Sequence, residues 1–215
     1  MQGQPGLASA ARPGALSRRL LRLADRLHER PSMSLGELLD TLGPAGFTLA
    51  IVVLAVPSFV PVPFLPTGVV CGTLLVLLAP QMVNGRTRRV WVPDQLRRRL
   101  VPGGALGAAL RRAVPALARV EGWLRPGRLR VLAGARARPL MAAFVLLMGL
   151  TLIVPVPLCN TPPAAALVIL ATGLSARDGG AVLAGLAASV AAMAWVVALS
   201  WGAFLAADWG LHAVW

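Results

Sequence analysis

Three long stretches of this 215-residue chain contain no charged side chain, and they limit what the chain can fold into. They cover residues 41–85, 139–176 and 179–207, with 45, 38 and 29 residues respectively. A helix needs about 20 apolar residues to cross a bilayer core, so each stretch is long enough to fill one. With 57% hydrophobic and 13% charged residues overall, the sequence predicts an all-α membrane protein rather than a soluble domain.

Prolines interrupt the first stretch at its centre. Each proline removes a backbone amide donor and disfavours helix at the residue before it. The interruption leaves two legs, Gly46–Val60 and Thr67–Val83. At 1.5 Å per residue the legs reach about 22 and 25 Å, less than the core thickness of about 30 Å. Residues 46–85 are therefore predicted to form a membrane hairpin broken at Pro57, Pro61, Pro63 and Pro66.

The second stretch, residues 139–176, repeats this design. It has a leg at Pro139–Val154, a proline turn, and a leg at Thr161–Leu174. At an offset of 94 residues, Val60-Pro61-Val62-Pro63 aligns with Val154-Pro155-Val156-Pro157, and Thr67 aligns with Thr161. We interpret the two hairpins as an internal repeat.

Paired interruptions in two halves of a membrane protein are a sequence pointer to a central binding site. Freed carbonyls, the amides at the two threonines and the leg N-termini can face a polar ligand there. The other interpretation is that the prolines only shape tight turns. The candidate turn site comprises Pro61, Pro63, Thr67, Pro155, Pro157, Asn160 and Thr161.

Two placements of the turns are open. If the legs span the membrane, the turns lie at the outer interface; if the hairpins are re-entrant, the turns meet near the middle of the bilayer. The re-entrant placement is slightly favoured, because two turns packed together can satisfy backbone groups that lipid cannot.

Positive charge is concentrated between the two hairpins. Residues 86–138 carry a net charge of +12, compared with +2 for residues 1–45 and −1 for residues 139–215. Such a block could attract nucleic acid, but its place between membrane runs favours a cytoplasmic segment that contacts anionic lipid headgroups. We therefore expect a multi-pass protein of the bacterial inner membrane, with the N-terminus and residues 86–138 in the cytoplasm and no nucleic-acid partner.

Amphipathic helices are predicted in both cytoplasmic parts. After a disordered segment at 1–15, residues 16–45 carry leucines at helical spacing and a capping box at Ser34 and Glu37. Leucines at 106, 110 and 117 recur at near-helical spacing within 86–138, which indicates helices lying on the inner leaflet. Glycines and prolines should break these helices into short pieces, at positions 102, 103, 104, 115, 126 and 127.

The third stretch predicts a full C-terminal transmembrane helix at 179–208, followed by tryptophans typical of an interface, which places the C-terminus outside. Just before it, Arg177 and Asp178 could form an ion pair. Asp178 as the cap of the last helix is the favoured alternative.

No catalytic constellation is visible. His28 and His212 are far apart in the sequence, Cys71 and Cys159 lie inside apolar runs, and the membrane runs hold no paired carboxylates. We expect no enzyme, no metal site and no cofactor. The Arg-rich inner face and the turn amides favour passage of a lipid-linked or anionic molecule; the alternative is a non-transporting accessory protein whose Arg-rich face binds anionic lipid or a synthase complex. The oligomeric state is left open.

Several segments between about residues 33 and 200 occur in an order that resembles the ExoD family of bacterial membrane proteins. The segments are Ser34-Leu35-Gly36-Glu37-Leu38-Leu39 with Gly43, the turn Pro57–Pro66, Gln81-Met82 with Gly85, Trp91-Val92-Pro93, Val154-Pro155-Val156-Pro157 with Asn160, and Arg177-Asp178-Gly179. The resemblance implies an inner-membrane protein needed for exopolysaccharide production or for envelope tolerance of alkaline stress. It implies no established reaction.

Overall fold

The computed structural model describes residues 14–29, 32–42, 46–59, 67–84, 91–125, 127, 129, 134, 137–154 and 159–214, without the side chains of residues 46, 67, 84 and 207–214. The described part is all-α, as the sequence predicts, apart from one two-stranded ribbon that the sequence does not predict. The predicted disordered segment at 1–15 lies almost wholly outside the described residues. The elements are α1 Ala15–His28, β1 Ser32–Ser34, α2 Leu35–Leu42, α3 Gly46–Ala55, η2 Val56–Phe59, α4 Thr67–Asn84, α5 Asp94–Arg97, β2 Leu100–Pro102, α6 Gly103–Trp123, α7 Arg138–Ile153, α8 Thr161–Ala176 and α9 Gly179–Val214.

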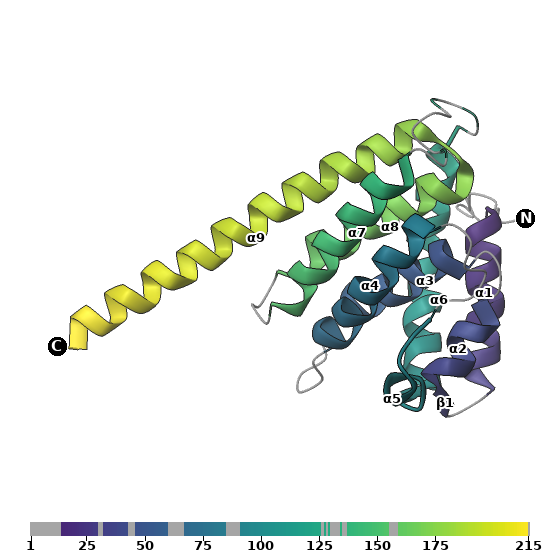
Figure 1. Ribbon diagram of the computed structural model, residues 1–215, viewed down its shortest axis with the longest axis horizontal. Helices are drawn as coiled ribbons and strands as arrows, with labels where there is room; N and C mark the ends of the chain where they lie inside the picture. The colour runs from purple at the N-terminus through teal and green to yellow at the C-terminus, as the bar shows by residue number, and fades with distance from the viewer. Residues whose placement is uncertain are drawn as a thin grey trace, which may run out of the picture.

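Four short apolar helices, α3, α4, α7 and α8, form the body of the molecule (Figure 1). The ends of these helices lie close to the ends of the four predicted legs, because the prolines and the limits of the apolar runs determine where each helix begins and ends. The first leg changes character before its end: α3 stops at Ala55 and a 3-10 turn, η2, continues to Phe59. Pro57 lies in η2, and its missing amide explains why the α-helix cannot continue.

The two helix pairs contact each other through α4 against α7 and through α3 against α8. Each contact joins the first leg of one predicted hairpin to the second leg of the other, so the two contacts are equivalent under the predicted repeat, although the repeat itself stays a prediction. Helices α4 and α7 run antiparallel, and their backbones meet at Gly72 and Gly149. A Cβ added at Gly72 would stand 2.6 Å from the carbonyl oxygen of Gly149. Two glycines therefore allow a closer approach than side chains would permit.

Helix α3 lies inside the molecule. Every side chain from Leu49 to Val56 is at most 6% exposed. The helix has 10 residues and is therefore about 15 Å long, which is half of a bilayer core. A helix this short and this enclosed is covered by protein rather than by lipid.

Helix α9 is the one helix among the described residues that is long and apolar enough to cross a membrane, over Gly179–Ala206. Its first half packs antiparallel on α8, with Gly173 against Val182 and Gly185 against Leu170. Its second half extends beyond the bundle (Figure 1). This long apolar helix suggests that the protein associates with a membrane.

Helices α1 and α6 form an antiparallel pair beside the bundle. The prediction that residues 86–138 break into short helical pieces is wrong, since α6 runs for 21 residues through Pro115. Pro115 lies on the exposed outer face, while Leu110 and Leu117 on the opposite face are buried against α1 and its neighbours. These contacts also correct the prediction that the apolar face of this segment lies on lipid.

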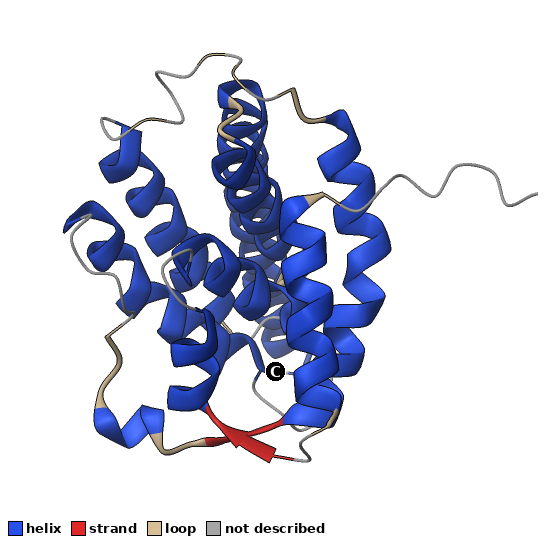
Figure 2. Ribbon diagram, turned by 90° about the vertical axis from the view of Figure 1, so that its right-hand side faces the viewer, coloured by secondary structure: helices blue, strands red, loops and turns tan. Residues whose placement is uncertain are grey.

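A short ribbon and α5 close one end of the molecule (Figure 2). Strand β1 pairs antiparallel with β2, in the register Met33 to Val101. The predicted capping box at the start of α2 is confirmed. The Glu37 amide donates to Ser34 Oγ at 3.2 Å, and the Ser34 amide donates to Glu37 Oε2 at 3.1 Å.

Candidate functional site

The candidate turn site lies at the end of the bundle where α7 ends and α4 and α8 begin. Its four predicted prolines lie outside the described residues, namely Pro61, Pro63, Pro155 and Pro157. Thr67 is the first residue of α4, and its side chain is not described. Asn160 and Thr161 stand at the start of α8. Both starts lie together, because Asn160 packs against Gly68, the second residue of α4.

Among the predicted site residues, Asn160 combines close backbone packing with a buried hydrogen-bond acceptor. A Cβ placed on Gly68 would stand 2.7 Å from Asn160 Nδ2 and 2.7 Å from the carbonyl oxygen of Leu152, near the end of α7. Asn160 Oδ1 is buried and has no hydrogen-bond partner among the described residues. A buried acceptor without a hydrogen bond costs folding free energy. A native structure that keeps one usually has a functional role for it or a bound water or ion that satisfies it.

A second unpartnered polar atom belongs to Ser58 in η2, which is 5% exposed. Its Oγ has no hydrogen-bond partner of ordinary geometry among the described residues. The Cys71 thiol of α4, a weak hydrogen-bonding group, is close enough to interact with it. Cys71 follows Gly68 by three residues, so both face the same side of α4. Ser58 and Asn160 therefore approach the same turn of one helix.

The candidate turn site predicted from the sequence does not include Ser58 or Gly68, although Ser58 is one of the polar residues nearest the first turn. The signal for Gly68 was available, because Gly68 and Gly72 have the small-residue spacing that lets helices approach closely in membranes. Its place near the turn is a weak signal for Ser58, because a serine beside a proline usually serves a turn.

The helix ends supply fewer donors at this site than the sequence suggests. Thr161 is followed by Pro162 and Pro163, which have no backbone N–H, and the Ala164 amide already donates to the Asn160 carbonyl at 3.1 Å. In the first turn of α8 this leaves the Thr161 amide as an available donor. The start of α8 is therefore a poor anion site, whereas the start of α4 keeps its amides.

The Arg177 and Asp178 pair has a structural explanation. Asp178 Oδ1 accepts the amides of Gly180 at 2.9 Å and of Ala181 at 3.4 Å, which caps α9. Its Oδ2 accepts the Arg125 amide at 2.8 Å. Arg177 is exposed in a left-handed conformation with φ 53°. Asp178 thus fixes the Arg-rich segment to the beginning of α9.

The outward face of the α1–α6 pair is the main basic surface among the described residues. Glu121 of α6 holds the pair together at one end, where it accepts the amides of Leu16 at 2.9 Å and Ser17 at 3.2 Å and the Ser17 hydroxyl. An ion pair of 2.9 Å between Arg111 and Asp25 crosses its middle. Exposed arginines then cover the surface, at positions 18, 19, 22, 26, 111, 112 and 119.

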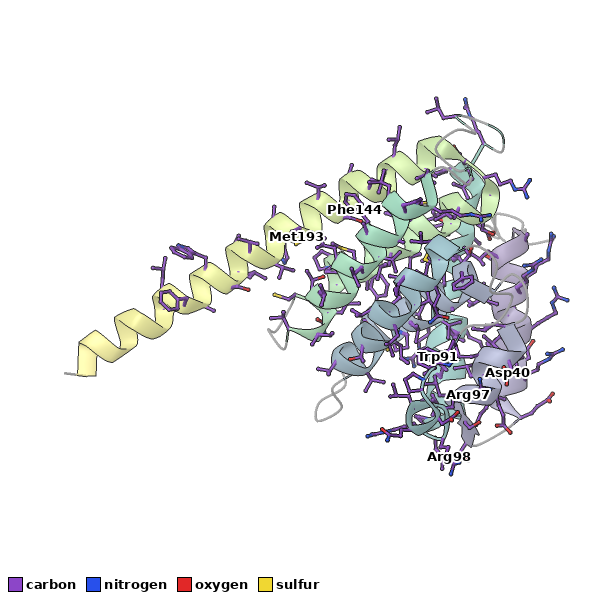
Figure 3. All side chains as sticks on the ribbon, viewed as in Figure 1. Asp40, Trp91, Arg97, Arg98, Phe144 and Met193 are labelled. Atoms are coloured by element: carbon purple, nitrogen blue, oxygen red, sulfur yellow. The ribbon has the colours of Figure 1, made fainter. Side chains whose placement is uncertain are left out.

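The exposed arginines of α1 and α6 and the exposed apolar side chains of α7 and α9 lie on different parts of the molecule. The labelled Asp40, Arg97 and Arg98 lie at the α2 and α5 end, and Arg97 pairs with Asp40 at 2.7 Å, whereas Phe144 and Met193 lie on α7 and α9 (Figure 3). Exposed apolar side chains are found on α7 and α9 and include Leu146, Leu147, Leu150, Val190, Val197, Trp201 and Phe204. An apolar face this large marks contact with a membrane or a partner.

Together, the fold and these surfaces define an all-α protein. It has one long apolar helix that suggests membrane association, a basic end formed by α1, α2, α5 and α6, and a bundle of short apolar helices. A family model described as "Exopolysaccharide synthesis, ExoD" matches residues 16–198. The chain belongs to this ExoD family, which is linked to exopolysaccharide synthesis.

Two relatives cover most of the chain. Protein ExoD of Rhizobium meliloti (strain 1021) is 26% identical over 178 residues, which are 81% of this chain and 73% of the relative. An uncharacterized protein of Synechocystis sp., slr1875, is 28% identical over 160 residues, which are 74% of this chain and 75% of the relative. No solved structure matches the chain.

Proposed function

We propose that this protein is a multi-pass inner-membrane protein that passes a lipid-linked or anionic intermediate of exopolysaccharide synthesis through one end of its helix bundle. This end, called the turn end below, is where α7 ends and where α4 and α8 begin. The proposal combines the family link with the geometry of that end. Ser58 Oγ and Asn160 Oδ1 are buried and have no hydrogen-bond partner of ordinary geometry among the described residues, and both residues lie beside the first turns of α4. Polar groups inside a membrane domain typically mark a binding site or a pathway.

The depth of the turn end carries the proposal. Helices α8 and α9 lie side by side and antiparallel, so that a step of one residue forward in α9 matches a step of one residue back in α8. Gly173 lies beside Val182, and Leu170 lies beside Gly185. Continuing this pairing brings Thr161 to the level of Ala194, two residues before Val196, which is the last buried side chain described in α9. The apolar segment of α9 continues to Ala206, which is about 15 Å further along the helix.

This depth favours re-entrant hairpins over spanning ones. The apolar segment of α9 has 28 residues and is about 42 Å long, so it crosses a core of about 30 Å when tilted. The turn end then lies nearer the middle of the bilayer than its outer surface. The short, enclosed α3 supports the same arrangement, because irregular backbone at membrane depth must be covered by protein.

Cysteine accessibility tests this placement. Phe59 and Val154, the last described residues before the two turns, are 37% and 38% exposed and accept a cysteine in a background with Cys71 and Cys159 replaced by alanine. We expect both positions to resist a membrane-impermeant thiol reagent added outside intact cells. Asp208→Cys is the outside control and Arg98→Cys the inside control. Labelling of both turn positions as strong as that of Asp208→Cys would show spanning legs and an architectural role for the turns.

An accessory role is the second candidate, favoured by the basic surface on α1 and α6. Since the apolar faces of these helices are buried against each other, the surface can bind anionic lipid or a synthase complex through charge alone. The two candidates separate in cells that lack their own family member and carry a variant. Passage predicts that Asn160→Leu lowers secreted polysaccharide more than an Arg112→Gln, Arg119→Gln double variant does; an accessory role predicts the reverse order.

We also propose that the protein acts without covalent catalysis and without nucleic acid as a partner. In the described part of the chain, acidic side chains belong to the basic end, as in the pairs Arg97–Asp40 and Arg111–Asp25, or to helix caps such as Asp178. An acid or base near Ser58 and Asn160 would be needed for chemistry at the turn end. Turnover of a candidate polysaccharide precursor by the purified protein would overturn this proposal.

A further inference from the structure

We propose that Trp91 anchors the protein in the headgroup region of the inner leaflet, and that the side chain of Gln81 positions it there. The inference rests on the multi-pass placement proposed above, in which α4 ends on the cytoplasmic side of the membrane. It starts from two of the segments that carry the family resemblance, Gln81-Met82 and Trp91-Val92-Pro93, because hydrogen bonds join them in the structure.

The Gln81 side chain binds both backbone groups of Trp91. Gln81 Nε2 donates to the Trp91 carbonyl at 2.7 Å, and Gln81 Oε1 accepts the Trp91 amide at 2.7 Å. The same Nε2 also donates to the Leu77 carbonyl within α4 at 2.8 Å. Trp91 belongs to no helix or strand, so its backbone has no ladder to bind to. Irregular backbone at the edge of a bilayer core needs such a partner, because water is scarce there.

The Trp91 side chain points outward beside an apolar surface. Trp91 is 62% exposed, whereas the next residue, Val92, is 3% exposed and fixes the segment to the protein. Val83, in the same turn of α4 as Gln81, is 49% exposed. Figure 3 shows the labelled Trp91 at the α2 and α5 end of the molecule, as it does Arg98. An indole between an apolar helix and arginines is typical of a membrane interface, where its ring is buried and its N–H stays wet.

Tryptophan fluorescence of the purified full chain in vesicles tests the anchor. The vesicles contain phosphatidylethanolamine and phosphatidylglycerol, with or without bromine on the acyl carbons nearest the headgroups, because bromine quenches a tryptophan that it contacts. The chain has six tryptophans, so one protein keeps only Trp91 and a reference protein keeps only Trp201 of α9, with phenylalanine at the other five positions. Trp201 is 64% exposed on the long apolar helix and reports membrane insertion itself. We expect brominated lipid to quench both.

The two reference signals separate failure of the anchor from failure of the membrane placement. Quenching of Trp201 by brominated lipid, with Trp91 quenched instead by iodide in the water, would overturn the anchor alone. Trp91 quenched by neither agent would show that protein covers the indole, for example in a second copy of the chain, and would also overturn the anchor. Lipid quenching of neither tryptophan would overturn the multi-pass placement as well.

A variant of Gln81 tests its positioning role by the same measurement. Gln81→Met keeps the length of the side chain and removes its three hydrogen bonds, so lipid quenching of Trp91 should fall about twofold or more while that of Trp201 stays unchanged. Thr73→Val is the matched control in α4, because the Thr73 hydroxyl donates to the Val69 carbonyl of its own helix at 2.7 Å. Unchanged quenching in Gln81→Met, or an equal loss in Thr73→Val, would overturn the positioning role.

Discussion

Gly72→Ala should destabilise the bundle, because Gly72 is where the backbones of α4 and α7 meet. The added Cβ would stand 2.6 Å from the Gly149 carbonyl oxygen and 2.9 Å from Ile153 Cγ1. Ordinary van der Waals contact begins at 3.4 Å, so the two helices must separate by most of an ångström at the crossing. Overpacking of this kind costs about 1–3 kcal/mol.

Two further glycines give this prediction an order. Gly149→Ala meets its nearest atoms at 3.1 Å, among them Leu75 Cβ, so a shift of a few tenths of an ångström relieves it. Gly202→Ala on α9 meets no atom within 4 Å and should be neutral or slightly stabilising, since alanine favours helix by up to about 1 kcal/mol. The expected order of melting temperatures is therefore Gly72→Ala lowest, then Gly149→Ala, then Gly202→Ala.

The assay is the fraction of folded protein that survives heating in mild detergent, measured by size-exclusion chromatography. For a chain of this size each 1 kcal/mol shifts the melting temperature by about 2–4 °C, so a cost of about 2 kcal/mol at Gly72 gives roughly 4–8 °C. A Gly72→Ala protein that melts with Gly202→Ala would refute the crossing. It would mean that α4 and α7 do not pack backbone to backbone.

Three other substitutions probe the basic end and the helix caps by the same heating assay. Glu121→Ala removes the distant cap of α1 and should cost about 1–2 kcal/mol, whereas Glu29→Ala, an exposed acid at the other end of α1, should not; equal melting temperatures would contradict the capping role. Asp178→Ala should cost a similar amount by uncapping α9 and releasing the Arg125 amide, and Asp178→Asn should recover part of the loss; no recovery would point to charge rather than capping. Pro115→Ala should stabilise α6 by restoring one helix hydrogen bond on an exposed face, worth up to about 3 kcal/mol, and a lower melting temperature would show that α6 needs the proline.

The ends of the short apolar helices followed from local rules. Prolines and charges punctuate the sequence so strongly that α7 and α8 begin and end within two residues of the predicted legs. The capping box at Ser34 and the cap at Asp178 were also predictable, because a cap depends on residues within one turn of it. The family link followed from the order of such local motifs.

Predictions that needed distant partners failed or were incomplete. The apolar stripe on residues 106–117 predicts a lipid-facing surface, but α1 covers it, because no periodicity within one segment can distinguish contact with lipid from contact with a second helix. The cap of α1 shows the same limit: Gly14 precedes the helix, and the capping carboxylate comes from Glu121, more than 100 residues away.

By itself, the sequence determined the apolar segments, their breaks, the basic end and the family, because each depends on residue type and spacing along the chain. Only the tertiary structure decided which breaks meet. It packed Asn160 and the Leu152 carbonyl against Gly68, brought Ser58 beside Cys71 in the next turn of α4, and left Asn160 Oδ1 without a hydrogen-bond partner among the described residues. A hydrogen bond that is not made depends on every element packed around it, so no local pattern could reveal it.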